Sequence, residues 1–382
     1  MPVHIRPRKE VLESVKKIVT QPSKMAAHPR IVEQLVSSPL LKLFVLSLVI
    51  LALTIFLIKK LFAPSDSHKK LPPSPSKVPI IGHLHKLGIH PHRSLQKLSQ
   101  KYGPIIMLRL GSVPTLVVSS AEAAQEVMKT HDLAFADRPR SKLNEKMLYN
   151  YKDVSSAPYG EYWRQMKSIC VIQLLSNKRV YDTRKVRENE TALLVKKIAE
   201  SSPLVVDLSD LLMAYTNDIV SMSSIGRKFS EGESGRRFRR MMKEFVSVLG
   251  GFDVGTYIPQ LAWFSSVMGL YNKVDAVAKE FDEFLERIVD EHISTSKQEK
   301  IEGAEDFVDV LLQIYNDKSI TGFSIDRESI KAIVLDVLAA GTDTTYTVLE
   351  WTMGKDLDMT ESTGIAIHKK EPLLAVAIPY SM

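Results

Sequence analysis

The chain has 382 residues, 45% hydrophobic and 25% charged, a balance that indicates neither wholesale disorder nor a polytopic membrane protein. Basic residues exceed acidic ones by 51 to 44, but the excess is spread along the chain without interleaved aromatics, which argues against a nucleic-acid-binding protein. The single cysteine, Cys170, excludes an intramolecular disulfide and a cysteine-based zinc site, and it suits a domain in the reducing cytosol.

An apolar segment near the N-terminus predicts a membrane anchor. It runs from Leu40 to Ile58, and as a helix its 19 residues rise about 28 Å, enough to cross a bilayer. It ends in Lys59 and Lys60 rather than in small residues, so we expect it to be an uncleaved anchor and not a signal peptide. Lysines are more frequent in the 20 positions after it than before it, which predicts that the bulk of the chain is cytosolic. Basic residues further upstream weaken that inference, and it is stronger if translation starts at Met25 instead of Met1.

After a basic and proline-rich hinge, short apolar runs at 105–110 and 115–118 predict a β-hairpin whose turn is Gly111-Ser112-Val113-Pro114. Beyond the hairpin, helical spacing dominates, and the polar stretch from Glu231 to Arg237 is predicted to be a loop. The helical ranges are 121–130, 161–175, 183–200, 236–250, 268–296 and 304–316. The expected fold class is therefore mainly α with a small β-sheet.

Residues 326–352 are the most informative segment. They predict a long helix with Asp326 as its N-cap and Glu328 in an acidic first turn. Near the end of its apolar pattern stands a polar hexapeptide, Ala340-Gly341-Thr342-Asp343-Thr344-Thr345.

The hexapeptide has residue types suited to a reactive site. Gly341 would let a ligand approach the backbone, and Thr344 is spaced to bond the carbonyl of Ala340 and open the helix locally. Asp343 and Thr344 would then form a carboxylate and hydroxyl relay that carries protons into a buried site. The alternative is a helix terminus with ordinary capping residues, because short motifs often occur by chance.

Five segments together, in chain order, resemble the cytochrome P-450 family of haem-thiolate monooxygenases, and specifically its plant microsomal members. They are Pro72-Pro73-Ser74-Pro75 with Gly82, Tyr102-Gly103-Pro104, Phe135-Ala136-Asp137-Arg138-Pro139, Ala157-Pro158-Tyr159-Gly160-Glu161-Tyr162-Trp163-Arg164, and the hexapeptide at 340–345. The resemblance covers nearly all of the chain up to Met353. It implies a cytochrome P-450-like haem domain behind an N-terminal transmembrane helix.

The resemblance also implies roles for individual residues. Asp343 and Thr344 would be catalytic, while Ala340, Gly341 and Thr345 would lie against the haem. Trp163 and Arg164 would donate hydrogen bonds to a haem propionate, for which indole and guanidinium groups are suited. The alternative for this pair is a core tryptophan beside a solvated charge.

The iron ligand that the resemblance implies is absent. The family places a thiolate in Phe-x-x-Gly-x-x-x-Cys-x-Gly, and Cys170 does not fit because Ile172 stands where glycine belongs. We therefore predict that Cys170 is a core thiol, and no metal ligand is assigned. A histidine in place of the thiolate is not expected, since the paired His-x-His segments, His83 with His85 and His90 with His92, are more typical of solvated loops than of metal sites, and His368 lies in the tail. Residues 354–364 resemble the stretch after the cysteine loop, so on the order of a hundred residues are expected to be missing between Met353 and Gly354.

These inferences divide the chain into five regions. They are an N-terminal extension (1–39), an anchor (40–58), a hinge (59–81), a P-450-like domain through the distal helix (82–353) and a tail resembling the family's final β-hairpin (354–382).

The expected function is hydroxylation of a small lipophilic plant metabolite, of the terpenoid or phenolic class. The resemblance implies haem as cofactor, NADPH-cytochrome reductase as partner and a single-pass location in the endoplasmic reticulum membrane. The first alternative is a catalytically inactive truncated isoform or a gene-model artefact that cannot ligate haem iron, with an uncovered apolar face. A single-pass scaffold unrelated to haem is the weakest reading.

Overall fold

The computed structural model describes residues 39–61, 71–229, 232–295, 305–320, 322–353, 358–362 and 364–378. The chain divides into two units, Met1–Lys70 and Leu71–Met382, and each is described by itself. The expected N-terminal extension, except Pro39, and the basic part of the hinge up to Lys70, except Lys59 to Leu61, lie outside the described residues.

In the first unit, the predicted anchor lies within one helix, α3 (Pro39–Leu61). Its 23 residues rise about 34 Å, and the described side chains from Leu43 to Leu57 are all exposed. Within the described residues, α17 of the second unit is a helix of at least 18 residues that is apolar enough to span a bilayer, and Leu43–Leu57 of α3 is a shorter apolar stretch. Since α17 buries Ile330 and Leu335 completely, its apolarity is that of a core helix.

The second unit is mainly helical with two small sheets, which confirms the predicted fold class. Its helices of six or more residues are α4 (Pro91–Tyr102), α7 (Lys142–Met147), α8 (Glu161–Gln173), α9 (Asn177–Asp182), α10 (Arg184–Glu200), α11 (Leu208–Ile225), α12 (Gly232–Leu249), α14 (Ala262–Val267), α15 (Leu270–Thr295), α16 (Phe307–Asn316) and α17 (Arg327–Met353). The shorter helical pieces are η1 (Leu84–Lys86), α5 (Ala121–Gln125), η2 (Glu126–Thr130), α6 (Asp132–Phe135), α13 (Val254–Tyr257), η3 (Pro259–Leu261) and η4 (Lys318–Ile320).

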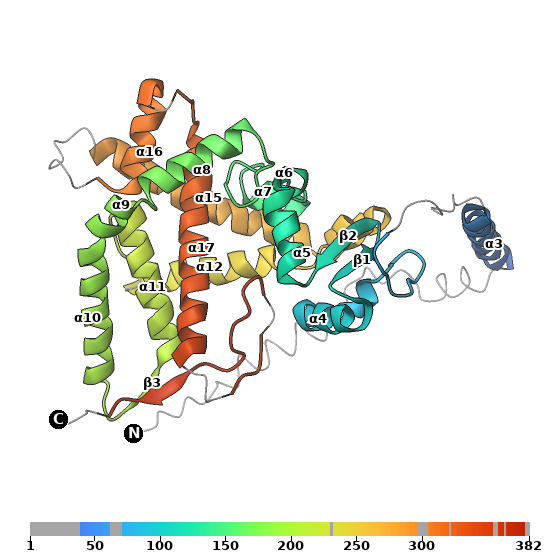
Figure 1. Ribbon diagram of the computed structural model, residues 1–382, viewed down its shortest axis with the longest axis horizontal. Helices are drawn as coiled ribbons and strands as arrows, with labels where there is room; N and C mark the ends of the chain where they lie inside the picture. The colour runs from blue at the N-terminus through green and yellow to red at the C-terminus, as the bar shows by residue number, and fades with distance from the viewer. Residues whose placement is uncertain are drawn as a thin grey trace, which may run out of the picture. The chain divides into compact units, whose positions relative to one another are not determined.

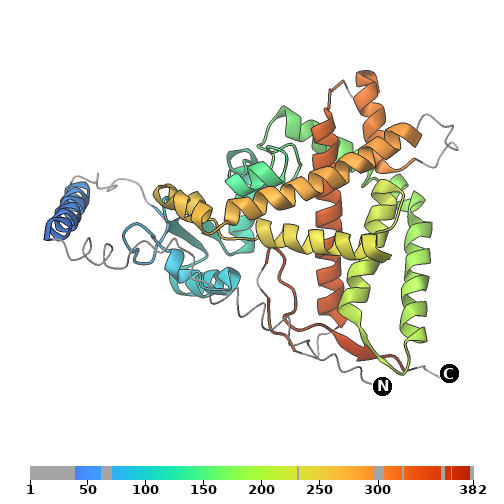
Figure 2. The same cartoon turned by 180° about the vertical axis from the view of Figure 1, so that it is seen from behind.

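Helix α17 lies at the centre of this unit. Figures 1 and 2 show α12 and α15 crossing it on one side and α8 on the other, with α11 alongside. Gly341 permits the contact with α11, because a Cβ at this position would stand 3.0 Å from a methyl group of Val220. The core between the helices includes three aromatic rings, Phe229, Phe238 and Phe284, with centroids 5.2 to 5.3 Å apart.

The predicted hairpin is present, but with a shorter turn. Strands β1 (Ile105–Leu110) and β2 (Val113–Val118) are antiparallel, with Pro114 opposite Arg109, so Gly111 and Ser112 alone form the turn. Gly111 has φ +61° and lies so close to Tyr257 that a Cβ would clash with its carbonyl oxygen. A proline is tolerated in β2 because the sheet has only two strands and both are edges.

The predicted loop at 231–237 is wrong for residues 232–237, which form the first two turns of α12. The polar residues there are the solvated face of an amphipathic helix whose opposite face buries Phe238, Met241 and Phe245. Arg237 forms an ion pair with Glu280 of α15 at 3.0 Å, so this segment also contributes a contact between α12 and α15.

The tail returns to the body of the unit. Strand β4 (Leu374–Val376) pairs antiparallel with β3 (Val205–Asp207), about 170 positions earlier, and Figure 1 shows this pair near one end of α17. A single antiparallel bridge joins Glu361 to Lys369. Residues 354–357, 363 and 379–382 of the predicted final hairpin lie outside the described residues.

Candidate functional site

The N-terminus of α17 is built as the sequence predicts. One carboxylate oxygen of Asp326 accepts hydrogen bonds from the backbone nitrogen of Ser329 at 2.8 Å and from its hydroxyl at 2.7 Å. Lys152 approaches both Asp326 and Glu328, the second at 2.6 Å. The cap and the acidic first turn stabilise the start of the helix and fix its register.

Thr344 makes the predicted bond. Its hydroxyl donates to the carbonyl of Ala340 at 2.7 Å, but α17 stays helical through this point, so the expected local opening is not present. Ala340, Thr344 and Thr345 are exposed, and Val348 is 64% exposed. Because residues 340, 344 and 348 share one face of a helix, α17 presents an open stripe of small and apolar side chains there.

Asp343 is directed to a histidine of the tail. Its carboxylate lies 3.2 Å from Nε2 of His368, and both side chains are less than one-fifth exposed. His368 also contacts the hydroxyl of Thr347 through Nδ1 at 2.9 Å and stacks on the ring of Tyr346. The tail therefore folds back onto α17 and partly buries His368. Of the histidine pairs expected to be solvated, His83 is instead buried, at 1% exposed.

A cavity of about 480 Å³ adjoins this pair. Its walls come from α11, α12, α17 and the tail, and both Asp343 and His368 line it. Thr342 and Tyr346 line it as well, so the cavity lies on the buried side of α17 and not on the open stripe of Ala340 and Thr344. The structure thus separates the hexapeptide into two faces.

Trp163 and Arg164 are already engaged with protein groups. The indole nitrogen of Trp163 donates to the carbonyl of Val154 at 3.0 Å, and Lys167 lies 4.6 Å above its ring. The guanidinium of Arg164 lies over the ring of Tyr159 at 5.5 Å. A contact of either residue with a propionate remains a prediction.

Cys170 has the environment of a core thiol. It lies on α8, half-buried against the main hydrophobic cluster. Burial, with a smaller contribution from the negative charge of Asp336, raises the pKa of this thiol to about 12. In the absence of a metal, a thiol in this environment is neutral at physiological pH.

Two carboxylates near α8, those of Asp336 and Asp153, lie close enough to interact, and the sequence did not predict this pair. Asp336 accepts bonds from the backbone nitrogens of Val154 at 2.7 Å and Ser155 at 3.0 Å. Burial, and then the nearby charge of Asp153, raise the pKa of Asp336 to about 6 despite these bonds. Only the fold could reveal this pair, because the two residues are far apart along the chain.

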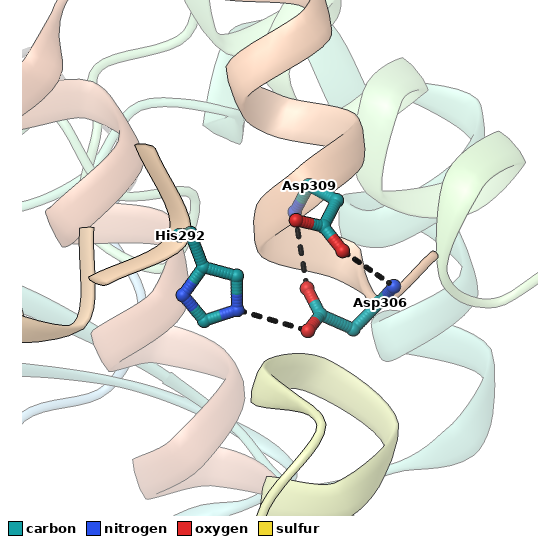
Figure 3. Close-up of side chains that lie close together, drawn as sticks. All are labelled: His292, Asp306 and Asp309. Carbon is teal, nitrogen blue, oxygen red and sulfur yellow. Dashed lines mark hydrogen bonds and ion pairs between the residues drawn. The ribbon is translucent and has the colours of Figure 1, made fainter. Parts of the chain in front are cut away.

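A third cluster has the composition of a metal site. His292, Asp306 and Asp309 offer ligand atoms within 4.8 Å of one another (Figure 3). Each nitrogen of His292 faces an acceptor, the carbonyl of Ile288 at 2.7 Å and the carboxylate of Asp306 at 2.9 Å, so the geometry fits a doubly protonated ring. Burial lowers the pKa of His292, but the hydrogen bond and charge of Asp306 outweigh burial and raise it.

The same cluster caps the N-terminus of α16. The Asp306 side chain accepts from the backbone nitrogen of Asp309, and the Asp309 side chain accepts from that of Asp306, in a reciprocal capping box. The cluster is therefore a structural clamp between α15 and α16.

Comparison with known proteins identifies the family. A family model described as cytochrome P450 matches residues 72–355. The chain belongs to the cytochrome P-450 family. It is 54% identical over 285 residues to "Cytochrome P450 736A117" of Prunus mume, which is 74% of this chain and 55% of the relative. It is 48% identical over 314 residues to "Cytochrome P450 71A22" of Arabidopsis thaliana, which is 82% of this chain and 62% of the relative.

A third relative carries a name that states an activity. The chain is 46% identical over 316 residues to "Norfluorocurarine oxidase" of Strychnos sp, covering 80% of this chain and 62% of that protein. The chain thus spans 55 to 62% of the length of these three plant relatives.

Haem is the cofactor of the P-450 family, so the described residues can be tested for their fit to it. On the α17 side, the open stripe of Ala340, Thr344 and Val348 leaves room for a flat ligand. On the iron side, the chain's single cysteine is a half-buried thiol whose pKa is raised. The described residues therefore leave room for a haem beside α17 but supply no thiolate for its iron.

Proposed function

We propose that this protein is the distal, substrate-facing part of a membrane-anchored haem monooxygenase that hydroxylates a small lipophilic plant metabolite of the terpenoid or phenolic class. The observation that supports this most is the open stripe of α17, where Thr344 holds its hydroxyl on Ala340 and small side chains leave space. In this proposal Asp343 and Thr344 deliver protons, and Ala340 and Thr345 contact the cofactor. Gly341, for which the same contact was expected, packs against Val220 of α11 instead. Trp163 and Arg164 bind a propionate after exchanging their present partners.

The proposal includes the cellular setting. NADPH-cytochrome reductase supplies electrons, α3 crosses the endoplasmic reticulum membrane once, and the second unit is cytosolic. Asn189 of the sequon Asn189-Glu190-Thr191 is exposed on α10, so it can report topology. A glycan on Asn189 in microsomes would contradict the cytosolic location.

The state of Cys170 favours a second candidate, a family member that binds lipophilic molecules without oxidising them. Oxygen activation in this family needs an anionic sulfur on iron. The one thiol of the chain is neutral and packed against the core. By itself, the 382-residue chain is then expected to be inactive.

A haem-binding experiment separates the two candidates. The 382-residue chain is purified with haem and compared with a chain that carries, between Met353 and Gly354, a cysteine-loop segment recovered from transcripts of the same gene. We expect the thiolate-type spectral shift with carbon monoxide only in the extended chain. Such a shift in the 382-residue chain would contradict the second candidate, and its absence from both chains, or the absence of any such transcript, would contradict the first.

Substitution of Thr344 then tests its assigned role in the extended chain. Thr344→Val is expected to lower product formation by roughly 100-fold, the scale of a lost proton-transfer group, whereas Thr344→Ser keeps a hydroxyl and most of the activity. Equal activity in the two variants would contradict a proton-delivering role for this side chain.

A further inference from the structure

Several buried polar atoms of the second unit have no hydrogen-bond partner among the described residues, and two of the side chains concerned line one cavity. They are Asn217 of α11, 1% exposed, and Thr342 of α17, 4% exposed. Neither the amide nitrogen and oxygen of Asn217 nor the hydroxyl of Thr342 is paired. Buried polar groups are normally hydrogen-bonded, because desolvation without a replacement partner costs free energy.

Both side chains line the same cavity of about 480 Å³. The helices that carry them pack closely, with Val220 of α11 against Gly341 of α17. Apolar side chains form much of the remaining wall: Met213, Phe238, Met242 and Val246. A mainly apolar cavity of this size with a few convergent polar groups is typical of a small-molecule site.

The cavity is partly open, so water can reach it and bond to Asn217 and Thr342. Water would leave the apolar part of the wall uncovered. An apolar body with one polar group would satisfy Asn217 and Thr342 and also cover the apolar wall.

The polar group is best matched by a hydroxyl. The amide of Asn217 and the hydroxyl of Thr342 can each donate and accept, and so can an alcohol or a phenol. Two charged groups of the lining have local partners, Arg239 with Asp210 at 3.8 Å and Asp343 with His368 at 3.2 Å. The third, Lys243, is exposed to solvent. Because none of the three charges is both buried and unpaired, a neutral ligand suits the interior of the cavity.

We infer that this cavity binds a neutral, mainly apolar molecule through one hydroxyl group held between Asn217 and Thr342. The site is distinct from the open stripe of α17, because Thr342 is two residues, or about 200° of helix rotation, from both Ala340 and Thr344. The inference goes beyond the proposed function and requires no cofactor.

Binding of two matched probes, 4-hydroxybiphenyl and 4-methylbiphenyl, to the full chain in detergent tests the inference. Equilibrium dialysis without haem measures both dissociation constants. We expect the hydroxyl probe to bind roughly tenfold more tightly, which corresponds to the free energy of about one hydrogen bond. Equal affinities, or binding of neither probe, would overturn the inference whether or not the chain ever binds haem.

Three variants locate the binding. Thr342→Val and Asn217→Leu are expected to abolish the advantage of the hydroxyl, and Thr342→Val should leave the melting temperature without probe unchanged or higher, because an unpaired hydroxyl is removed. Thr352→Val, on an exposed turn of the same helix, is the control and should retain the tenfold preference. A preference that persists in both cavity variants would assign the probe to another site.

Discussion

At the scale of single residues, burial decides the chemistry of Cys170 more than its place in the sequence does. The thiol packs against the hydrophobic cluster between the helices, and burial raises its pKa to about 12. A neutral, enclosed thiol is slow to react and slow to bind a metal. The sequence predicted a core thiol, and the structure supplies the physical cause.

Alkylation gives a direct check on Cys170. At pH 8 the native thiol should hold a roughly thousandfold lower fraction of thiolate than the unfolded chain, so iodoacetamide should label it at least a hundredfold more slowly than in urea. Mass spectrometry follows the single labelled position without interference, since the chain has one cysteine. Comparable labelling rates in the two conditions would show that the thiol is open and ionisable.

For other residues, the sequence predicts contacts with near neighbours in the chain but not contacts with distant segments. Asp326 and Thr344 bond groups three and four residues away, and helical spacing alone predicts such local bonds. Gly341 and Asp343 instead meet Val220 and His368, which lie far along the chain in opposite directions. Their surroundings could not be inferred, because no local rule brings α11 or the tail to α17.

At the scale of elements, the clamp between α15 and α16 shows how two helix ends are joined. His292 lies in the last turn of α15, and Asp306 both caps α16 and bonds the imidazole. Asp309 completes the capping box from the first turn of α16. Periodicity predicted both helices, but it could not predict that their ends share a charge pair.

The clamp predicts a specific pH dependence. The folded-state pKa of His292 is raised, so the stabilisation by its ion pair is fully present below the unfolded value near 6.5 and is lost as the pH rises through the folded pKa. Asp306→Asn keeps a capping side chain and removes the charge, and it should lower the free energy of unfolding by about 1–3 kcal/mol at pH 5.5 and by less at pH 9.

Asp306→Ala serves as the comparison for this prediction. It removes the cap as well, so it should cost about 1 kcal/mol more than Asp306→Asn at both pH values. Urea denaturation of the three chains measures these differences. A cost for Asp306→Asn that is independent of pH would mean that His292 is neutral in the folded protein.

At the scale of the whole second unit, a buried carboxylate joins segments from three parts of the chain. Glu350 of α17, 1% exposed, accepts bonds from the hydroxyls of Ser209 at 2.5 Å and Tyr346 at 3.1 Å and from the backbone nitrogen of Lys369 at 3.4 Å. Trp351 adds a bond to the carbonyl of Ile367 at 2.7 Å. These contacts, together with the β3 and β4 pairing, hold the tail on α17 and α11.

Removal of this carboxylate should release the tail. Glu350→Ala leaves the hydroxyls of Ser209 and Tyr346 without their acceptor, so we expect a loss of about 2–4 kcal/mol in the free energy of unfolding. Trypsin should then cleave after Lys369 several times faster than in the unmodified chain. Glu371→Ala, an exposed change in the same tail, is the control, and similar cleavage of both variants would argue against Glu350 as the anchor.

The sequence by itself determined what depends on short spacing. Apolar periodicity predicted the fold class and most of the long helices, but it gave no range for α4 or α11. The ordered motifs indicated the cytochrome P-450 family. These signals lie within a few helical turns or in the order of segments along the chain. The predicted start of α12 was wrong, because the polar stretch before it is part of the helix. Solvated loops and solvated helix faces have similar composition, so the sequence does not distinguish them.

The tertiary structure decided what depends on distant contacts. It placed Asp343 against His368, enclosed Asn217 and Thr342 in one cavity, and left Ala340 and Thr344 on an open face. The physical reason is that burial and partner choice follow from the packing of segments that are distant in sequence, from 25 residues apart for Asp343 and His368 to 125 for Asn217 and Thr342. One helix can therefore present opposite environments within two residues.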